Sequence, residues 1–577
     1  MKLKLLFVMV LVSPCVYSQG LMGKALAKLA KAMAPPPATV SNLDQVVPMA
    51  GLSGNLHPVE LGTISQSFFN GWTTGGDMAW LMFTRKDTSA FVKIDGTVTV
   101  NGVPVEYSTA GTYALISGAN AAARKVEITT STGQKAGFTM EPAKSKVKVL
   151  SVNGQKDNIS LDLTKDVVIE LENTDVPANA MLRVDLAINQ VGIKSQYGVC
   201  YIRSGASITI PAAAFRNINI KPAGGAVYNY KKSFISVTVE TTEPAVGVSG
   251  AFPGLTYIRS YSDGKFVTIS KEPNLNTGLV AKGKEDLKDG TMSYEFSKPN
   301  AFSSRPLPMM KKIGISSISV MGKTVSVSSV ITQEKDNLKG EAQTTKTTTV
   351  TFPQQTNETW EAVIAKLYPQ LAAIVQKELN ATIVPVEAIQ KTAAYQSVSK
   401  YAQAEVNTAK EFLIDYDHAS PLRTMPVGQG AGAYGINEKM MNEAGVDALM
   451  KISLSLEVQQ DGDYGVLVPK LTFEITGKAN GRETATVYYS GTLTGKGVPS
   501  ENIGLRVEYA SANGITGDTK GRNSDKTYHH AGTIGSDELD RIVRRSDLLA
   551  LFAKGLKEIK DQEKANGDYE VVWQLQQ

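Results

Sequence analysis

The segment Phe91-Val92-Lys93-Ile94-Asp95-Gly96-Thr97-Val98-Thr99-Val100-Asn101-Gly102 indicates the fold class of the N-terminal part of this chain. Apolar and polar residues alternate on both sides of Asp95-Gly96, and Asn101-Gly102 follows the second run. Alternation of period two predicts a strand with one buried face, and Asp-Gly or Asn-Gly between two such runs is a strong hairpin signal. The segment therefore predicts a hairpin at Asp95-Gly96 within antiparallel β-structure.

The same pattern continues on both sides of this segment, over residues 40–242. Further strands are expected at 146–150, 167–171, 206–210 and 234–239, with Asn153-Gly154 as another turn signal. Many short strands separated by turn residues predict Ig-like β-sandwich modules. We expect two modules in series, one over residues 40–145 and one over residues 146–242.

Residues 243–305 are rich in Gly, Pro, Ser and Lys and are predicted to be a connecting region, with a candidate strand around 265–269. Residues 306–577 predict an α/β domain. Asn357 or Thr359 can cap a helix whose apolar residues recur every three or four positions until Asn380. The other elements expected are helices at 438–444 and 538–563, the second capped by Asp537, and strands at 312–320, 381–386, 446–454, 471–476 and 485–490. This order predicts a sheet with helices on one side.

A family resemblance covers residues 310–565. The features that carry it are, in chain order, the strand 313–320, the long helix, the edge strand at Ile383-Val384-Pro385, the segment Ala394-Tyr395-Gln396, and the joint Gly445-Val446-Asp447-Ala448-Leu449. This order resembles the periplasmic domain shared by the curli-secretion lipoprotein family (CsgG) and the N-terminal domain of TolB-type proteins. The resemblance implies envelope assembly or oligomerisation rather than catalysis.

Residues 1–18 have the features of a secretory signal peptide. Lys2 and Lys4 precede an apolar run at 5–12, and Val16-Tyr17-Ser18 offers a small residue for cleavage before Gln19. The apolar run is shorter than the ~20 residues that cross a bilayer. We therefore expect an exported protein that is periplasmic, outer-membrane-associated or secreted, and the cleavage site resembles those of Bacteroidetes-type Gram-negative bacteria.

Residues 19–39 predict a basic amphipathic helix followed by a proline spacer at 35–37. At about 100° per residue, lysines fall on one side and apolar residues on the other. The two sets are Lys24, Lys28 and Lys31, and Met22, Leu26, Leu29 and Met33. Such a helix can lie on an anionic membrane, dock in a partner groove, or pack on its own protein.

Bulk composition limits the classes of function. A chain of 577 residues predicts about three to five domains. The formal net charge is +5, of which Lys2 and Lys4 supply two charges, so no basic field for nucleic acid is expected. The chain has two cysteines. Cys15 lies within 1–18, where a weak lipobox makes lipidation an alternative, and Cys200 is expected to be a buried, inert thiol.

Few residues offer catalytic, metal or cofactor chemistry. Gly430-Ala431-Gly432-Ala433-Tyr434-Gly435 matches a dinucleotide fingerprint but lacks a preceding buried strand, so a glycine-rich loop is expected. The four histidines are His57, His418, His529 and His530, and a metal role would need carboxylates brought in by folding, for example Asp415 and Asp417 beside His418. Asp461-Gly462-Asp463 is read as a turn, because the other ligands of a calcium loop are missing. We expect no enzyme, no metal and no cofactor, although paired carboxylates of a glycosidase are invisible in a linear sequence.

One stretch of aromatic residues offers an alternative function. Its members are Phe68, Phe69, Trp72, Trp80 and Phe83. Trp72 and Trp80 could form a platform for glycan stacking, while packing in a β-domain core is the simpler interpretation. The leading hypothesis is a non-catalytic envelope protein that works through protein partners, self-assembly or a membrane surface. The alternative is a glycan-binding, conceivably hydrolytic, envelope protein.

Overall fold

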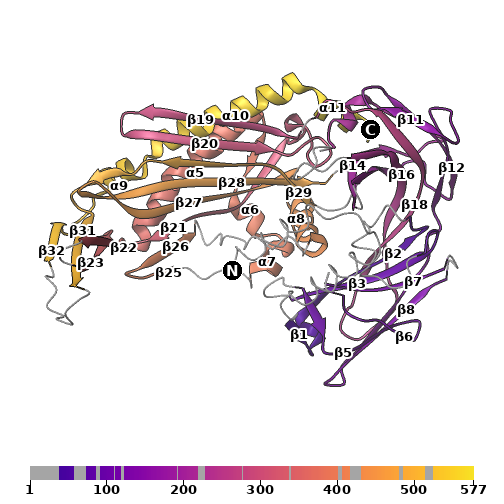
Figure 1. Cartoon of the computed structure of the whole chain (residues 1–577), viewed down its shortest axis with the longest axis horizontal. Coiled ribbons are helices and arrows are strands. Elements are labelled where there is room, and N and C mark those ends of the chain that lie inside the picture. Colours follow the sequence, from indigo (N-terminus) through magenta and orange to yellow (C-terminus); the bar gives the residue numbers. More distant parts are fainter. Residues whose placement is uncertain are drawn as a thin grey trace.

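The computed structural model describes residues 38–57, 73–85, 91–108, 111–118, 122–190, 193–218, 228–275, 277–336, 340–399, 406–415, 430–479, 485–513 and 524–577. Strands dominate, and the longer helices belong to the C-terminal part (Figure 1). This confirms the prediction of a β-rich chain whose N-terminal part is built from sheets and whose C-terminal part combines a sheet with helices.

One long sheet organises the N-terminal part. Its path is β14-β13-β16-β18-β2-β3-β7, with β11 paired to β18. The strands are β2 (Val46–Gly54), β3 (Asp77–Arg85), β7 (Thr112–Ser117), β11 (Ile159–Asp162), β13 (Met181–Gln190), β14 (Ile193–Arg203), β16 (Tyr228–Pro244) and β18 (Thr256–Lys271). The sheet thus contains strands from both expected modules, and β18, from the expected connecting region, joins the two sets.

Two smaller sheets share cores with this long sheet. One is β10-β12-β15, formed by Lys146–Val152, Val167–Thr174 and Ser207–Ile210. Its Val149 and Ile169 belong to the same buried cluster as Val184 and Val237 of the long sheet. The other is β17-β9-β8-β5-β6, formed by Val246–Ser249, Lys135–Met140, Arg124–Thr130, Gly96–Val100 and Val103–Pro104. Sheet-on-sheet packing is therefore present, but one long sheet supports both smaller ones.

The hairpin predicted at Asp95-Gly96 is wrong. β4 (Val92–Ile94) pairs with β1 (Ala38–Val40) in a parallel ladder, whereas β5 pairs with β8 and β6. A Cβ on Gly96 would lie 2.1 Å from the carbonyl oxygen of Thr129, so glycine is needed where the chain passes from one sheet to the next. The turn predicted at Asn101-Gly102 is confirmed, because both residues have positive φ and join Val100 to its partner Val103.

Residues 243–305, expected to be a connecting region, are mostly strands, and the candidate strand at 265–269 lies within β18. The region contains β17, the long strand β18, and the hairpin of β19 (Leu279–Leu287) and β20 (Gly290–Lys298). Asp263-Gly264 has the composition of a turn, yet Gly264 lies inside β18 as the ladder partner of Ser236, and the ring of Phe234 covers it. A Cβ there would meet that ring at 2.6 Å.

The C-terminal part is a ten-stranded sheet covered on one side by helices. Its path is β19-β20-β29-β28-β27-β21-β26-β25, with β24 on β21 and β30 on β28. The strands not yet named are β21 (Lys312–Lys323), β24 (Thr382–Val384), β25 (Val406–Asn407), β26 (Glu411–Asp415), β27 (Ala448–Asp461), β28 (Tyr464–Lys478), β29 (Ala485–Gly495) and β30 (Val498–Ser500). The sheet therefore begins before the boundary expected at residue 306, since it includes β19 and β20.

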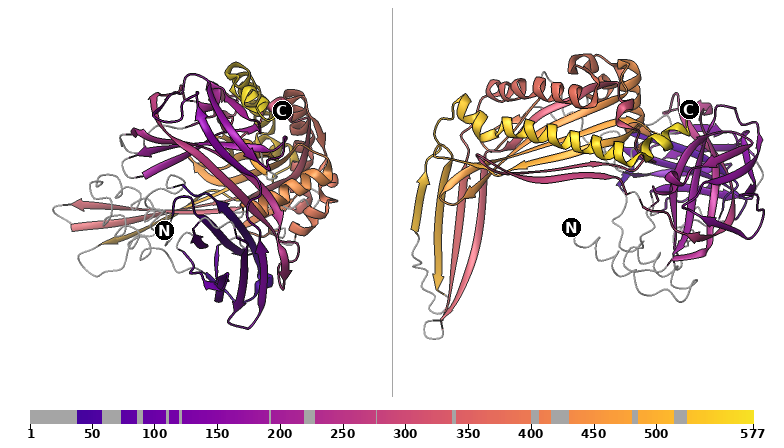
Figure 2. Two further views of the ribbon diagram at one scale, coloured as in Figure 1. Left: turned by 90° about the vertical axis from the view of Figure 1, so that its right-hand side faces the viewer. Right: turned by 90° about the horizontal axis from the view of Figure 1, so that it is seen from above.

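The long helices α5 (Asn357–Leu379) and α10 (Arg545–Asn566) pack on each other and on this sheet, which they cover from one side (Figure 2). Thr356, and not Asn357 or Thr359 as expected, caps α5 through its side chain. Asn380 ends the helix in the left-handed conformation, as predicted. Shorter helices are α4 (Ala212–Phe215), α6 (Val386–Gln390), α7 (Ala393–Ser399), α8 (Gly430–Ala444) and α11 (Asp568–Gln574). The glycine-rich segment 430–435 thus begins a helix, contrary to the expected loop.

The single helix predicted over 538–563 is interrupted. α9 (Ser536–Val543) ends at Arg544, which has a left-handed φ of 56° and also precedes α10. The Arg544 guanidinium donates to the carbonyl oxygens of Gly290, Thr291 and Lys496 and to the Asp547 carboxylate. These tertiary contacts stabilise a break that local helix propensity does not predict.

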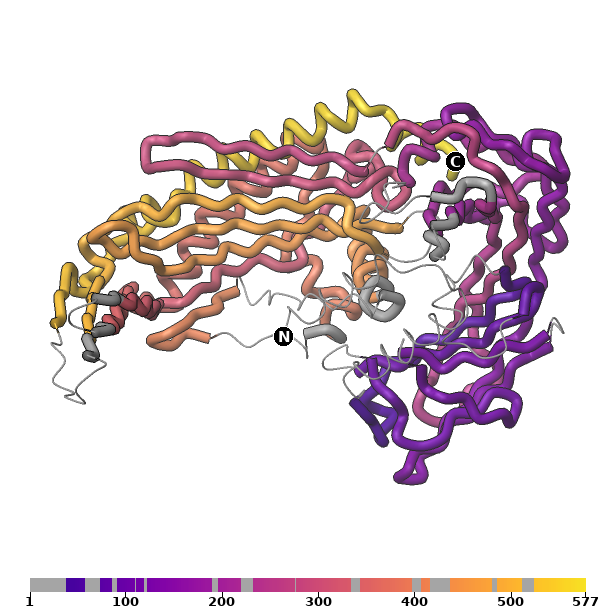
Figure 3. Tube along the Cα trace, viewed as in Figure 1, coloured from indigo at the N-terminus to yellow at the C-terminus, as the bar shows by residue number. Residues whose placement is uncertain are grey.

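The molecule is elongated and bent. The N-terminal sheets lie at one end, and the ten-stranded sheet leads away from them to a small projecting sheet at the other end (Figure 3). Seen from above, the projecting sheet and the N-terminal sheets both extend to the side of the ten-stranded sheet opposite α5 and α10 (Figure 2). The open face of the ten-stranded sheet is therefore flanked by the projecting sheet at one end and by the N-terminal sheets at the other.

Candidate interaction surfaces

The first candidate surface is the projecting four-stranded sheet, which we call the arm. It consists of β22 (Val325–Asp336), β23 (Gly340–Thr351), β31 (Gly504–Asn513) and β32 (Ser524–His529), in the order β22-β23-β31-β32. All three pairings are antiparallel. The arm extends well away from the other described residues (Figure 2).

The root of the arm is firmly held. Thr324, 1% exposed, joins β21 to β22; its N–H donates to the Lys410 carbonyl and its carbonyl accepts from the Phe352 N–H. Val350 and Ile503 are buried at the root over Gly465, where a Cβ would lie 2.4 Å from Ile503. The arm is therefore a rigid extension of the ten-stranded sheet at its base.

The outer strand β22 exposes apolar side chains. Val327, Val330 and Ile331 are 63%, 59% and 59% exposed, in a run without charge from Val325 to Gln333. Among the described residues, β22 has β23 as its one ladder partner, so its other edge presents main-chain donors and acceptors. Natural proteins normally protect such an edge with charge, proline or a covering element, because it invites strand addition.

The opposite edge, β32, is polar. Arg506 of β31 donates to both carboxylate oxygens of Asp525, at 3.0 and 2.9 Å from Nε, and this hydrogen bonding lowers the pKa of Asp525. His529 stacks on Tyr464 with ring centroids 4.9 Å apart, at the base of the strand. The two edges of the arm therefore differ in chemistry, since residues 325–333 of β22 carry no charge whereas β32 carries Asp525 and Lys526.

The second candidate surface is a groove of about 1020 Å³ on the open face of the ten-stranded sheet. Ser and Thr side chains from β20, β21, β27, β28 and β29 line it, together with lysines and glutamates. Lys451 Nζ lies 3.9 Å from Glu474 Oε1. Ser319 and Ser453 are cross-strand neighbours whose hydroxyls are buried without a hydrogen-bond partner among the described residues. Such a lining can bind polar groups, and the described residues that form it include no His or Cys.

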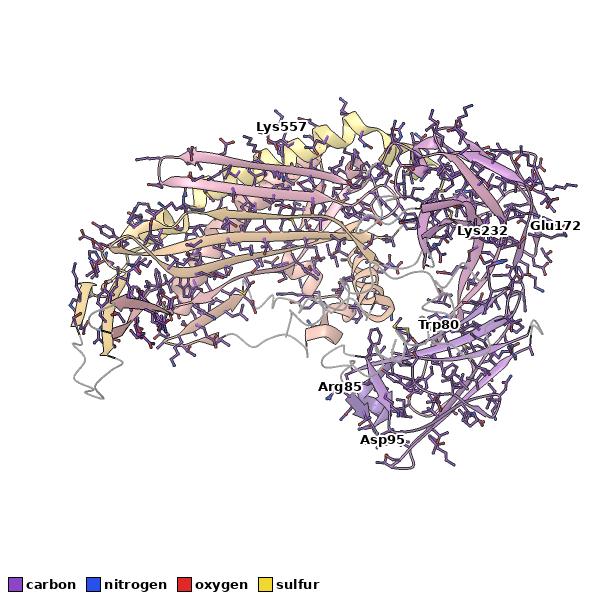
Figure 4. All side chains as sticks on the ribbon, viewed as in Figure 1. Trp80, Arg85, Asp95, Glu172, Lys232 and Lys557 are labelled. Atoms are coloured by element: carbon purple, nitrogen blue, oxygen red, sulfur yellow. The ribbon has the colours of Figure 1, made fainter. Side chains whose placement is uncertain are left out.

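The aromatic stretch considered as a glycan platform is only partly described. Phe83 is fully buried in the core beside Tyr113, with ring centroids 5.7 Å apart. Trp80 is half-buried on the other side of β3 and lies across Gly51, where a Cβ would be 2.3 Å from its ring. Trp80 is labelled in Figure 4. Trp72 lies outside the described residues, as do Phe68 and Phe69.

The predicted basic helix also lies outside the described residues, with Lys24, Lys28, Lys31, Leu26 and Leu29. Of the histidines, His418 lies outside them too. Burial lowers the pKa of His57, whose ring packs on Phe234 with centroids 4.8 Å apart. Asp461-Gly462-Asp463 forms the turn between β27 and β28, as predicted, with Gly462 at a φ of 60°.

Cys200 is fully buried in β14, as the sequence predicts, and burial raises the pKa of its thiol. We expect a thiol reagent to leave Cys200 unmodified in the native protein, because the thiolate is the reactive form and the sulfur is inaccessible. Labelling with Ellman's reagent in buffer and in guanidinium chloride measures this. Rapid reaction at Cys200 in buffer would contradict the prediction; labelling at Cys200 under denaturing conditions is the positive control.

No described group of three or more His, Cys, Asp or Glu side chains could hold a metal ion. Within the same residues, no helix is both long enough and apolar enough to cross a membrane. Comparison with family models and with curated proteins yields no match for this chain. The surfaces themselves are therefore the basis for any functional proposal.

Proposed function

We propose that this chain is a non-catalytic, exported cell-envelope protein that assembles with further copies or partner subunits through the edges of its arm. The observation that carries the proposal is an antiparallel sheet of four strands, projecting from the molecule, with an exposed apolar edge strand. The signal-peptide pattern of residues 1–18 supplies the expected location.

Strand direction favours association between copies. Strands alternate in direction across the arm, so the two edge strands β22 and β32 run in opposite directions. When a second copy is placed beside the first in the same orientation, its β22 meets the first copy's β32 in antiparallel alignment. Such head-to-tail contacts use two different surfaces, and they generate either a closed ring or an open filament.

The side chains of β22 supply a driving force. Burying three β-branched side chains that are now about 60% exposed would contribute a few kcal/mol to each contact, at about 25 cal/mol per Å². Main-chain hydrogen bonds along the edge would add direction and register.

The resemblance of residues 310–565 to the CsgG and TolB periplasmic domains supports the same proposal, since it implies assembly rather than catalysis. In this proposal the N-terminal sheets act as Ig-like spacer modules. The hydroxyl-lined groove would face the enclosed side of an assembly, because its lining residues lie on the open face of the ten-stranded sheet and the arm extends to that side.

The replacements Val327→Lys and Ile331→Lys test the arm. Both side chains lie on the same face of β22, and charge on an edge strand opposes strand addition. We expect the wild-type protein, extracted gently from envelopes, to have a mass well above that of one chain, which is 61.8 kDa before any signal-peptide cleavage, and the double variant to have the mass of one chain. Mass photometry measures both, and circular dichroism should be unchanged.

Val280→Lys is the matched control, because Val280 is 51% exposed on β19, an edge strand outside the arm. This variant should assemble like the wild type. A wild-type protein that stays monomeric at all concentrations, or equal loss of assembly in the control, would refute the proposal.

The alternative proposal, glycan binding through Trp72 and Trp80, has its own test. Retardation of the protein in polysaccharide gels that is lost in Trp72→Ala and Trp80→Ala would favour it. Trp80 is half-buried and its ring packs on Gly51, so we rank this function second.

A further inference from the structure

The sheet of β2, β3 and β7 has an apolar face on the side turned away from its core. On the core side, Ala79, Leu81 and Phe83 are fully buried. On the other side the half-buried residues are Met49, Met78, Trp80, Met82, Ile116 and Ile258. We call these six residues the methionine face.

The methionine face is continuous across four strands. Met82 is the ladder partner of Met49, and Met78 is the partner of Ile116. Gly51 has Trp80 on one side and Ile258 on the other, and the absence of a side chain there lets the indole lie flat on β2. The six residues therefore form one surface.

Polar residues border this apolar area. Next to it on the same face of the sheet lie Arg183, Asp185, Ser236, Thr238 and Ser262, and beyond them lies the aromatic pair Phe234 and Phe266. A sheet face exposed to water normally carries polar residues. Methionine adapts to irregular partners and is frequent on surfaces that bind amphipathic helices. The composition of the methionine face thus fits an apolar helical ligand.

The point where the described chain begins lies beside this face. Ala38 of β1 pairs with Val92, and the adjacent Phe91 bridges to Thr84, two residues beyond Met82. Two strand spacings of ~4.8 Å separate Ala38 from Thr84. The residues that precede Ala38 are therefore tethered at the end of the methionine face.

The residues before Ala38 match the face in length and pattern. Leu21–Met33 predicts a helix with an apolar stripe of Met22, Leu26, Leu29 and Met33. At 1.5 Å per residue its thirteen residues would span ~20 Å, about the width of four strands. The spacer at 35–37 adds ~3 Å per residue, enough to reach the face from β1.

We infer that the methionine face is the docking site for the chain's own segment Leu21–Met33, bound as an amphipathic helix with its lysines toward solvent. The same apolar stripe is the part of the segment that could bind a membrane or a partner groove. Docking on the methionine face and binding to a membrane or a partner groove therefore exclude each other. The segment stays docked until a membrane or a partner groove binds its apolar stripe. The inference is independent of the arm.

Methionine oxidation reports directly on this site. Peroxide converts exposed methionine to its sulfoxide, and mass spectrometry resolves each residue. In the full chain, Met49, Met78 and Met82 should oxidise at least five-fold more slowly than Met309, which is 40% exposed. The variant Leu26→Glu/Leu29→Glu should accelerate oxidation of all three several-fold, because its apolar stripe is lost.

Lys24→Gln/Lys28→Gln is the matched control, since it changes the opposite side of the segment and should leave the three rates unchanged. A second test pairs Leu29→Cys with Met82→Cys in a Cys15→Ser background. We expect a disulfide within one chain, and none when Lys28→Cys replaces Leu29→Cys.

Four results would overturn the inference. One is fast oxidation of all three methionines in the wild type. Another is slow oxidation of the three methionines that persists in Leu26→Glu/Leu29→Glu, because a different segment would then cover the methionine face. A third is cross-linking between chains, which would assign it to a second copy. The last concerns anionic vesicles that bind the segment. If adding them leaves the oxidation rates of the three methionines in the wild type unchanged, docking and membrane binding coexist.

Discussion

Lys298→Met is expected to lower the free energy of unfolding by about 3–5 kcal/mol, because it leaves the carboxylate of Glu563 buried without its cation. Lys298 has no exposed surface, and its ammonium lies 3.2 Å from Glu563 Oε2. It also donates to Ser304 Oγ and to the Arg305 carbonyl, both at 2.6 Å. Glu563 Oε1 accepts from the Leu307 N–H at 2.7 Å. The pair therefore joins β20, the chain before β21, and α10. Urea unfolding followed by circular dichroism measures the loss.

Lys298→Met/Glu563→Gln is the control for this prediction. The amide oxygen still accepts from Leu307, but no uncompensated charge remains, so at least half of the lost stability should return. Burial raises the pKa of Glu563, so the deficit of the single variant should also shrink as the pH falls and this carboxyl takes up a proton. A single variant within 1 kcal/mol of wild type, or a double variant no better than the single one, would contradict the argument.

The pair also predicts a pH dependence of the wild type. Burial lowers the pKa of Lys298 to about 8, below the unfolded value near 10.5. Between these values the unfolded state binds more protons than the folded state, so this group makes stability increase with pH from about 8 to 10.5. The unfolding free energy of the wild type minus that of Lys298→Met/Glu563→Gln should therefore increase as the pH rises from about 8 to 10.5.

Sequence reasoning succeeded where a local signal is sufficient. Asn380 ends α5 and Asn101-Gly102 forms a hairpin turn, because both depend on positive φ at particular residues. It failed where distant residues decide. Asp95-Gly96 has a hairpin sequence, yet the Asp95 N–H donates to the Val40 carbonyl and the Asp95 carbonyl accepts from Ser131, which separates the two strands. The break at Arg544 likewise depends on carbonyl groups of β20 and of Lys496.

The candidate surfaces were predictable only in part. The alternating residues of β22 indicate a strand, but its projection from the molecule depends on the packing of Val350 and Ile503 at the root. The methionine face left a clearer signal, since Met78, Trp80 and Met82 alternate with Ala79, Leu81 and Phe83 and make β3 apolar on both sides. A strand of that kind indicates cover on both faces. Trp80 was identified from the sequence, but its methionine neighbours were not.

Phe296→Ala is expected to cost about 3–5 kcal/mol of stability, the usual range for removing a fully buried phenylalanine. Its ring contacts those of Phe473, Tyr489 and Phe552, with centroid distances of 5.0, 5.9 and 6.0 Å. The ring lies against Gly491 of β29 and Gly555 of α10, where an added Cβ would come within 2.4 and 2.2 Å of it. These two glycines let α10 approach the sheet closely enough for one ring to fill the space between them.

Removing that ring leaves a cavity that the glycines cannot fill, so α10 should loosen before the sheet does. Limited proteolysis within 545–566 should therefore accelerate in Phe296→Ala by more than global unfolding alone predicts. Val280→Ala on the neighbouring strand β19 is the control, and it should change stability by less than about 0.5 kcal/mol, because Val280 is 51% exposed. Gly555→Leu should mimic Phe296→Ala, since its side chain would force the ring out of the same space. If Phe296→Ala destabilises the protein but leaves cleavage of α10 unchanged, the helix is held by its contacts with α5 instead, and the glycines serve only to fit the ring.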